Sequence, residues 1–290
     1  MSFYDGGIRL LYAGSGSVAN ENAYITRNAF NLYSNDPMYV GYMYGTSGSL
    51  ANNRTNQTNK STAASTIESW YTATFNNNSD NKTKDTSGNL LTTYINPSAI
   101  YCNDRSVPSN YTYNTGSTTF YYGALTRLHT NKAPSYACGA TTEGYGHYFE
   151  ESPSIADKFT GSQANKAGII IGNGLLGATP AGLITADEIS FAGGVYASNS
   201  PAWYYYNAAE TPTPITGERW WWTMSPIVWN GSYFYAIVFI VYGSAHPGYL
   251  SFNYVHNSGG VVRPVISLKA NVLWKSGTGA PTSPFEVELP

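Results

Sequence analysis

The chain has 290 residues, a net charge of −2 and a pI near 6.1, so it offers no sign of a surface for nucleic acid. Its length suits one large domain or two small ones. Only 11% of the residues are charged, where soluble domains have about 25%, and 26 residues are tyrosine. Solubility then depends on Asn, Ser, Thr, Gly and Tyr, a composition found in antibody paratopes and equally expected of a β-rich extracellular protein.

The N-terminal part is predicted to hold short strands and one helix. Apolar runs ended by glycine predict strands at 6–14 and 38–45. Ser65 and Glu68 have the spacing of a capping box, and apolar residues follow near helical spacing. Together these signals predict a helix over 65–75.

Two stretches without a regular pattern, 46–64 and 103–165, are predicted to be irregular insertions. The second is too long for a plain loop in a compact domain, so we expect it to be functional or weakly structured. Between 167 and 177, an apolar run leads into glycines spaced as in a dinucleotide-binding loop. Pro180 prevents a helix of useful length from starting there, so a strand and a turn are predicted instead.

A second helix is predicted over 185–194, where Thr185 and Glu188 form another capping box and a glycine pair ends the helix. Asp187 and Glu188 could be an acid/base pair or metal ligands, but capping and the helix dipole explain both, which favours a structural role. From 220 to 268 the pattern predicts β-strands, and the tail predicts a turn and a final strand. The fold class is therefore α+β, with two main helices, short antiparallel strands and long irregular connections.

No catalytic constellation, metal site or cofactor motif emerges. Cys102 and Cys138 could form one disulfide in an oxidising compartment or remain buried thiols. His246 and His256 have no cysteine or acid near them in sequence, so we interpret them as polar surface contacts. The most apolar run, 235–243, is far shorter than the roughly twenty residues of a membrane helix, and the opening residues lack a signal-peptide pattern.

Seven fragments of the sequence together carry a resemblance to known proteins. They are "GIRLLY", "VGYMYG", "YCNDRS", "GLITADEISFAGG", "WTMSP", "VVRPVISL" and "SGTGAPTSPFEV". Together they resemble a family of bacterial and phage-associated surface domains with the C-type-lectin-like fold, in its formylglycine-generating-enzyme-like subtype. The resemblance covers most of the chain, is most specific over 182–285, and implies a single domain over 1–290.

In that family the stretch between "WTMSP" and "VVRPVISL" is often the variable region of a diversity-generating retroelement, which here corresponds to 220–268. Mutation at adenines then changes exposed side chains while the fold holds the backbone fixed. The acidic "WND" and the "EPN" of calcium-dependent lectins are missing, so calcium-dependent sugar binding is not expected. No cysteine follows Cys138, so the late cysteine pair of the formylglycine-generating enzymes is missing too.

The resemblance divides this region into scaffold and ligand-binding positions. The scaffold positions would be Ala236, Val238, Val241, Leu250, Val255 and Val262. The ligand-binding positions would be Tyr233, Phe234, Tyr235, Ile237, Ile240, Tyr242, His246, Tyr249, Phe252, Asn253, Tyr254 and His256. The alternative for Ile237, Ile240 and Phe252 is that they belong to the core. No Lys, Arg, Asp or Glu occurs from Trp220 to Val262, so recognition would rest on aromatic burial and hydrogen bonds.

The expected function is that of a non-enzymatic, receptor- or adhesin-type domain with a hypervariable Tyr-rich surface. Its partner would be a protein or glycan on a cell surface, and its place would be extracellular, on a bacterial surface or a phage particle. Any membrane attachment would come through an N-terminal anchor. One alternative is a structural surface or pilus subunit whose aromatic strip packs against neighbouring subunits. An enzyme of the same fold is the other alternative, which the missing cysteines disfavour.

Overall fold

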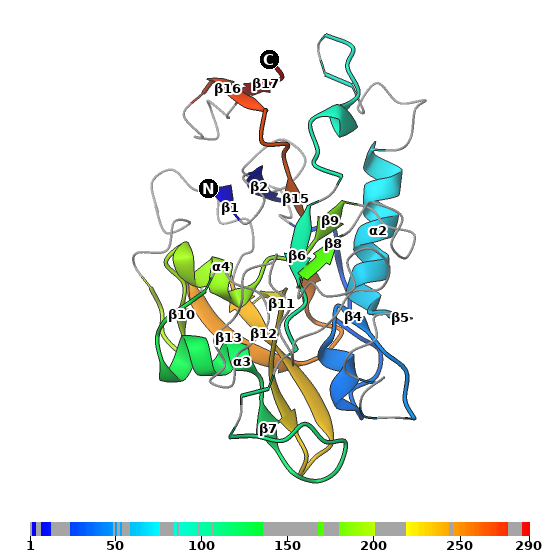
Figure 1. The fold of residues 1–290 in the computed structure, drawn as a ribbon, viewed down its shortest axis with the longest axis vertical. Helices are drawn as coiled ribbons and strands as arrows, with labels where there is room; N and C mark the ends of the chain where they lie inside the picture. The colour runs from blue at the N-terminus through cyan, green and yellow to red at the C-terminus, as the bar shows by residue number, and fades with distance from the viewer. Residues whose placement is uncertain are drawn as a thin grey trace.

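Strands dominate the part of the chain that the computed structural model describes, and helices are few, in agreement with the α+β class (Figure 1). The described residues are 2–3, 7–12, 24–48, 50, 53, 59–75, 84–85, 87–97, 99–105, 107–108, 110–135, 168–170, 180–200, 219–243, 246–277 and 286–290.

A seven-stranded sheet organises the molecule. Its strands, in spatial order, are β10 (Val195–Tyr196), β13 (Tyr249–Tyr254), β12 (Tyr235–Tyr242), β11 (Trp220–Asn230), β14 (Val261–Val262) and β3 (Thr26–Arg27), while β7 (Phe120–Tyr121) also pairs with β11. The pairs are antiparallel, except that β10 runs parallel to β13 and β14 parallel to β11. The prediction of strands over 220–268 is therefore confirmed.

The central strand β12 is buried on both faces of this sheet. On one face Val238 and Ile240 join a core that includes Ile67 of a long helix. On the other face Ile237 and Phe239 join a second core. A strand covered on both faces reads as a continuous apolar run, which explains why the most hydrophobic stretch of the sequence falls here.

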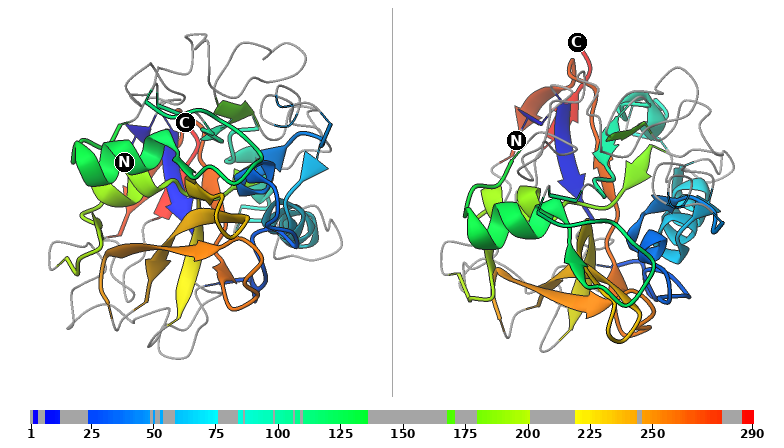
Figure 2. Two further views of the ribbon diagram at one scale, coloured as in Figure 1. Left: turned by 90° about the horizontal axis from the view of Figure 1, so that it is seen from below. Right: turned by 60° about the horizontal axis from the view of Figure 1, so that its bottom comes forward.

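The helices divide between the two faces of the sheet. They are α2 (Thr62–Phe75), α3 (Gly123–Leu125), which continues as the π-helical turn η4 (Thr126–Thr130), and α4 (Ala186–Phe191). Residues of α2 pack in the first core, and residues of α3, η4 and α4 pack in the second. Figures 1 and 2 show α3, η4 and α4 close together, on the opposite side of the molecule from α2.

Both predicted helices exist, but one of the two predicted caps is wrong. In α4 the capping box is confirmed: the hydroxyl of Thr185 accepts from the Glu188 N–H at 3.1 Å, and the Glu188 carboxylate accepts from the Thr185 N–H at 2.8 Å. In α2 the hydroxyl of Ser61 accepts from the Ala64 N–H at 3.1 Å, so the helix begins at Thr62. Ser65 lies inside the helix and caps nothing.

Smaller elements complete the fold. A second sheet has the order β1 (Ser2–Phe3), β2 (Gly7–Leu11), β15 (Val265–Ser267), β9 (Ala181–Gly182), and two-stranded pairs are formed by β4 (Met43–Tyr44) with β5 (Asn59–Lys60), β6 (Ile100–Cys102) with β8 (Gly168–Ile170), and β16 (Leu273–Ser276) with β17 (Glu286–Glu288). The strands predicted at 6–14, at 167–177 and in the tail are confirmed by β2, β8 and β17. The glycines that follow β8 lie outside the described residues.

The strand predicted over 38–45 is only partly correct. Residues Pro37–Val40 form the 3₁₀-helix η1, and only β4 is extended. The carboxylate of Asp36 accepts from the Met38 N–H at 2.8 Å, and proline at the first helical position fixes a helical φ. The only other described 3₁₀-helix is η3 (Leu91–Thr93). The apolar run alone predicts a strand, whereas the Asp36 cap and Pro37 favour a helical turn at its start.

Part of the stretch predicted to be an irregular insertion, 103–165, is ordered and central. Residues 110–135 contain β7, α3 and η4, and Phe120, Tyr122 and Arg127 are buried. The stretch 46–64 is also not irregular throughout, because β5 pairs with β4 and α2 begins at Thr62. Residues 136–165, including Cys138, and the side chain of Cys102 lie outside what the structure describes, so the possible disulfide stays a prediction.

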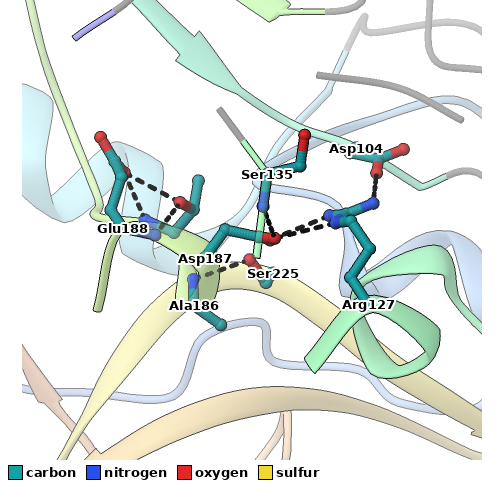
Figure 3. Close-up of polar contacts among 8 residues, drawn as sticks. Asp104, Arg127, Ser135, Ala186, Asp187, Glu188 and Ser225 are labelled. Atoms are coloured by element: carbon teal, nitrogen blue, oxygen red, sulfur yellow. Dashed lines mark hydrogen bonds and ion pairs between the residues drawn. The ribbon is translucent and has the colours of Figure 1, made fainter. Parts of the chain in front are cut away.

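A buried ionic network joins α4 to η4 and to the segment after β6 (Figure 3). The guanidinium of Arg127 donates to both carboxylate oxygens of Asp187, at 2.8 and 2.9 Å, and to Asp104 at 3.1 Å. The backbone N–H of Ser135 donates to Asp187 at 2.9 Å. Burial lowers the pKa of Arg127, but Asp187 and then Asp104 outweigh it, so its pKa lies above the ordinary value and the group stays charged.

The fragments that carry the family resemblance meet in and around this network. Arg9 of "GIRLLY" pairs with Glu188 of "TADEIS" at 2.8 Å. Asn103 of "YCNDRS" accepts from the N–H of Tyr42 in "VGYMYG" at 2.9 Å. Ser225 of "WTMSP" accepts from the first N–H of α4 at 2.9 Å, an arrangement that Figure 3 includes.

The fragment "VVRPVISL" contributes a further contact of this kind. Arg263 lies 3.6 Å from the ring centroid of Trp221 and donates to the carbonyl of Tyr12 at 2.8 Å. Six of the seven fragments therefore contribute to the scaffold, and their charged side chains are engaged within it; the seventh, "SGTGAPTSPFEV", is described only at its two ends.

Removing one member of the Arg127 network should destabilise the fold strongly. We expect Asp187→Ala to lower the free energy of unfolding by about 3–5 kcal/mol, because it leaves the buried guanidinium without its bidentate partner. Urea denaturation checks this, with the exposed Glu288→Ala as the control that should change little. A loss below about 1 kcal/mol for Asp187→Ala would contradict a structural role for the network.

Candidate ligand-binding surface

The residues predicted to bind a ligand do not form one continuous surface. Ile237 and Ile240 are buried in the two cores, Ile240 with no exposed area, so neither can contact a ligand at the surface. Their outward placement was wrong because β12 is a central strand with packing on both faces, and alternation does not separate inside from outside there. The scaffold positions are confirmed as buried: they are Ala236, Val238, Val241, Leu250, Val255 and Val262.

Most of the exposed predicted residues gather where β11 turns into β12 and where β13 ends. The rings of Tyr235, Tyr254 and His256 contact one another, with centroids 4.8 to 5.9 Å apart. Tyr233 and Phe234 project from the turn, and Tyr233 is 71% exposed. Aromatic pairs at these separations contribute beyond their buried area, so the three rings support one another.

The turn that carries Tyr233 and Phe234 is held in one conformation. The Asn230 side chain accepts from the Tyr233 N–H at 3.3 Å. Gly231 lies against the backbone of Ser117, where a Cβ atom would come within 2.5 Å of backbone atoms. Phe234 has a φ of 56°, which is rare for a bulky residue and persists only where the surroundings fix it.

A neighbouring loop braces the same turn. The indole N–H of Trp229 donates to the carbonyl of Gly116 at 3.0 Å, and the N–H of Gly231 donates to the Thr119 hydroxyl at 3.1 Å. The loop holds itself through Asn114, whose amide donates to the carbonyls of Thr112 and Thr118. The exposed aromatic residues therefore sit on a rigid base rather than on a loose loop.

Two exposed residues of this region were missed from the sequence. The segment 31–34 lies across the end of the β12–β13 pair, because the Asn31 N–H donates to Val255 at 2.9 Å and Ser34 accepts from the Ala236 N–H at 2.8 Å. Leu32 and Tyr33 are exposed, Tyr33 at 61%. The sequence offers one signal for this pair, which is two adjacent apolar residues among polar ones; no hydrophobic periodicity marks them.

We call this region the tip surface. It consists of Leu32, Tyr33, Tyr233, Phe234, Tyr235, Phe252, Tyr254 and His256. It lies at the end of the molecule where β7 and the β11–β12 turn meet, opposite the end that carries β16 and β17 (Figure 1). None of its members is an acid, a lysine or an arginine. Tyr39 lies beside this surface, with its ring centroid 5.7 Å from that of Tyr33. Burial is the largest cause that raises the pKa of Tyr39, and the nearby Tyr44 and Asp36 raise it further.

The remaining aromatic candidates form a separate cluster. Tyr242, His246 and Tyr249 contact one another with centroids 5.1 to 5.9 Å apart, and all three are only partly exposed. This cluster lies at the other end of β12, about 23 Å from Tyr235 by the ordinary rise of a strand. Asn253, the last candidate, is partly exposed and accepts from the Tyr254 N–H at 2.9 Å.

The acidic residues considered as catalytic or metal-binding are committed to the scaffold. Asp187 binds Arg127 and Ser135, and Glu188 binds Arg9 and caps α4, which supports the structural interpretation. Within the described ranges, no three His, Cys, Asp or Glu residues come together where they could hold a metal ion.

Comparison of the chain with protein-family models, with curated proteins and with solved structures finds no match. No helix in the described part of the chain has the length and apolar character needed to cross a membrane.

The stability losses caused by substituting Tyr233 and Ile240 should differ, because one side chain is exposed and the other is buried. We expect Tyr233→Ala to change the free energy of unfolding by no more than about 0.5 kcal/mol, because the ring is mostly in solvent. Ile240→Ala should lower it by about 2–5 kcal/mol, because it leaves a cavity in the core. Thermal and urea unfolding of the two variants check this, and equal losses would contradict the assignment.

Proposed function

We propose that the chain is a non-enzymatic ligand-binding domain of the receptor or adhesin type, and that the tip surface contacts the ligand. The observation that carries this proposal is the gathering of exposed aromatic residues at one end of a sheet whose interior is fixed on both faces. Exposed apolar patches on soluble proteins usually mark interaction sites. Tyrosine-rich patches suit recognition because large rings bury area at low entropic cost.

The chemistry of the tip surface points to short-range recognition. Without charged members it can offer ring faces, tyrosine hydroxyls and the imidazole of His256, so electrostatic steering would be weak. We therefore expect affinity to depend little on salt concentration. The partner would be a protein or a glycan on a cell surface, with the domain displayed outside a bacterial cell or on a phage particle.

The finer assignment is also a proposal: a C-type-lectin-like fold whose stretch 220–268 is diversified by a retroelement. The contacts among the resembling fragments support it, because residues of six of these fragments bond to one another inside the scaffold and none of those residues belongs to the tip surface. Under this proposal Ile237 and Ile240 belong to the scaffold, and variation would concentrate at Tyr233, Phe234 and the exposed residues of β13.

A structural surface or pilus subunit is the second candidate, and one feature favours it. The β16–β17 pair forms a two-stranded sheet of its own, and it exposes Trp274 at 65% together with Leu273 and Val287. An isolated two-stranded sheet with exposed apolar residues is only marginally stable without a packing partner. Sedimentation at rising concentration tests this: self-association that Trp274→Ala abolishes would favour the subunit.

Binding should depend on the tip surface and not on exposed aromatic residues elsewhere. We expect the double variant Tyr33→Ala/Tyr233→Ala to raise the half-saturating concentration at least about tenfold, as hot-spot aromatic residues do. The probe is the labelled domain on a panel of intact bacterial strains, read by flow cytometry on the strain that binds most. Trp274→Ala, an equally exposed aromatic residue at the opposite end, is the matched control.

The reverse outcome, in which Trp274→Ala weakens binding and the double variant does not, would place the contact face elsewhere.

Diversification has a test of its own in the DNA beside the gene. We expect a near-identical repeat of the segment that encodes 220–268, differing mainly at adenines, next to a reverse-transcriptase gene. Genome sequencing of the source strain checks this. If no such repeat exists, the retroelement part of the proposal fails, while ligand binding by the tip surface remains to be judged on the binding data.

A further inference from the structure

The backbone of β13 has an inner and an outer side. Val255 donates its N–H to the carbonyl of Ala236 at 3.1 Å, and Asn253 and Ser251 face β12 residues in the same register. Since backbone groups alternate in direction along an antiparallel strand, these residues bond inward to β12. The alternate residues, Leu250, Phe252 and Tyr254, direct their N–H and C=O groups to the outer side.

Among the described residues, only the first part of that outer side is covered. Strand β10 pairs with Tyr249 and Leu250, and the Ala197 N–H donates to the Leu250 carbonyl at 2.9 Å. Ala197 then has a φ of 58°, a left-handed conformation that is unfavourable for alanine, and Ser198 bridges back to Val195. The chain therefore turns away, and on this outer side no strand in the described residues pairs with β13 beyond Leu250, while β12 pairs with its inner side.

Of the outward residues, Phe252 is left open. Both backbone groups of Tyr254 are hydrogen-bonded to nearby residues: its N–H donates to the Asn253 side chain at 2.9 Å, and its carbonyl accepts from the Asn257 N–H at 3.0 Å. No described strand faces the N–H and C=O of Phe252. One residue of an incoming antiparallel strand can form two hydrogen bonds with such an N–H and C=O of a single residue.

Within the described part of the chain, the same edge lacks the usual protection. Natural edge strands avoid pairing with other chains through lysines, prolines, bulges or a covering element. Strand β13 carries none of the first three, and its Phe252 ring is 49% exposed beside the exposed Tyr254. An uncharged aromatic edge that stays open in this way suits a partner that is itself uncharged and extended.

We propose that an extended, uncharged peptide segment of the ligand adds to the edge of β13 as a strand. It exchanges two hydrogen bonds with the backbone of Phe252 and lays alternate side chains against the rings of Phe252 and Tyr254. This inference rests on the proposed function, because it names the chemistry of the partner that the tip surface takes.

A second copy of the chain fits this edge less well. If two β13 strands paired around a twofold axis at Phe252, Leu250 of one copy would face Tyr254 of the other. The outer side of Leu250 is already bonded to Ala197. A peptide segment that begins abreast of Phe252 and runs past Tyr254 avoids Leu250 and needs a hydrogen-bonding pair only from Phe252, because the backbone of Tyr254 is already bonded to Asn253 and Asn257.

The probes are heptapeptides selected from a phage-displayed random library on the immobilised domain and then synthesised with blocked ends. Phe252→Pro removes the outward N–H, which an edge strand tolerates, and Phe252→Ala keeps that N–H while removing the ring. We expect Phe252→Pro to weaken peptide binding at least tenfold more than Phe252→Ala does. We also expect N-methylation of one alternate set of peptide residues to abolish binding, and N-methylation of the other set to leave it intact.

Each other outcome overturns the inference in a distinguishable way. If peptide binding ignores Phe252→Pro and N-methylation but is lost in Tyr233→Ala, the edge inference fails and the proposed function stands. If none of these changes affects any selected peptide, both fail. A dimer in sedimentation that Phe252→Pro abolishes would make a second copy the occupant. If urea denaturation shows that Phe252→Pro is unfolded, the N-methylated peptides test strand addition on the unaltered domain.

Discussion

The rest of the structure depends on the burial of Arg127 between Asp187 and Asp104. These three side chains come from η4, from α4 and from the segment after β6, so one guanidinium fixes three parts of the chain that are distant in sequence. A charge buried this deeply is tolerated only with full hydrogen bonding, and the arrangement therefore admits little displacement of any partner. Because the first N–H of α4 donates to Ser225 of β11, and the carbonyl of Ile184 just before α4 accepts from the Met224 N–H, the network also fixes the position of the sheet.

The sheet passes that rigidity on to the tip surface. Strand β12 is held by a core on each face. Its backbone is therefore fixed by buried residues, and not by the side chains that project from its two ends. Interior packing and surface chemistry are thereby separated in space: the buried side chains form the two cores, and the exposed rings lie at the strand ends and on the β11–β12 turn. The proposed recognition function would need this separation, and the strained φ of Phe234 can persist only on such a base.

The sequence allowed the class of fold to be predicted because its strongest signals are local. The capping box at Thr185 and the apolar runs of β2, β11 and β12 needed no distant partner to be recognised. The residues that complete the tip surface were a different case. Leu32 and Tyr33 reach it only through backbone bonds to β12 and β13, and nothing in their own neighbourhood reveals those partners.

The errors have the same origin in tertiary structure. Ile237 and Ile240 looked like outward residues of an alternating strand, but alternation loses its meaning when both faces are covered. Arg127 stood in a stretch with no pattern, and its importance lies in two acids far along the chain. Ser65 had the spacing of a helix cap, yet the hydroxyl of Ser61 was better placed to accept the first free N–H.

If the cores and the Arg127 network carry the fold, the scaffold should fold independently of the rings it displays. Saturation mutagenesis of the whole domain on the yeast surface, read as protease resistance at each position, measures this. We expect Tyr233, Phe252, Tyr254 and His256 to accept most residues without loss of resistance, whereas Arg127, Asp187 and Ile240 accept almost none. If the tip residues proved as intolerant as the buried ones, they would be part of the folding core, and the account would be wrong.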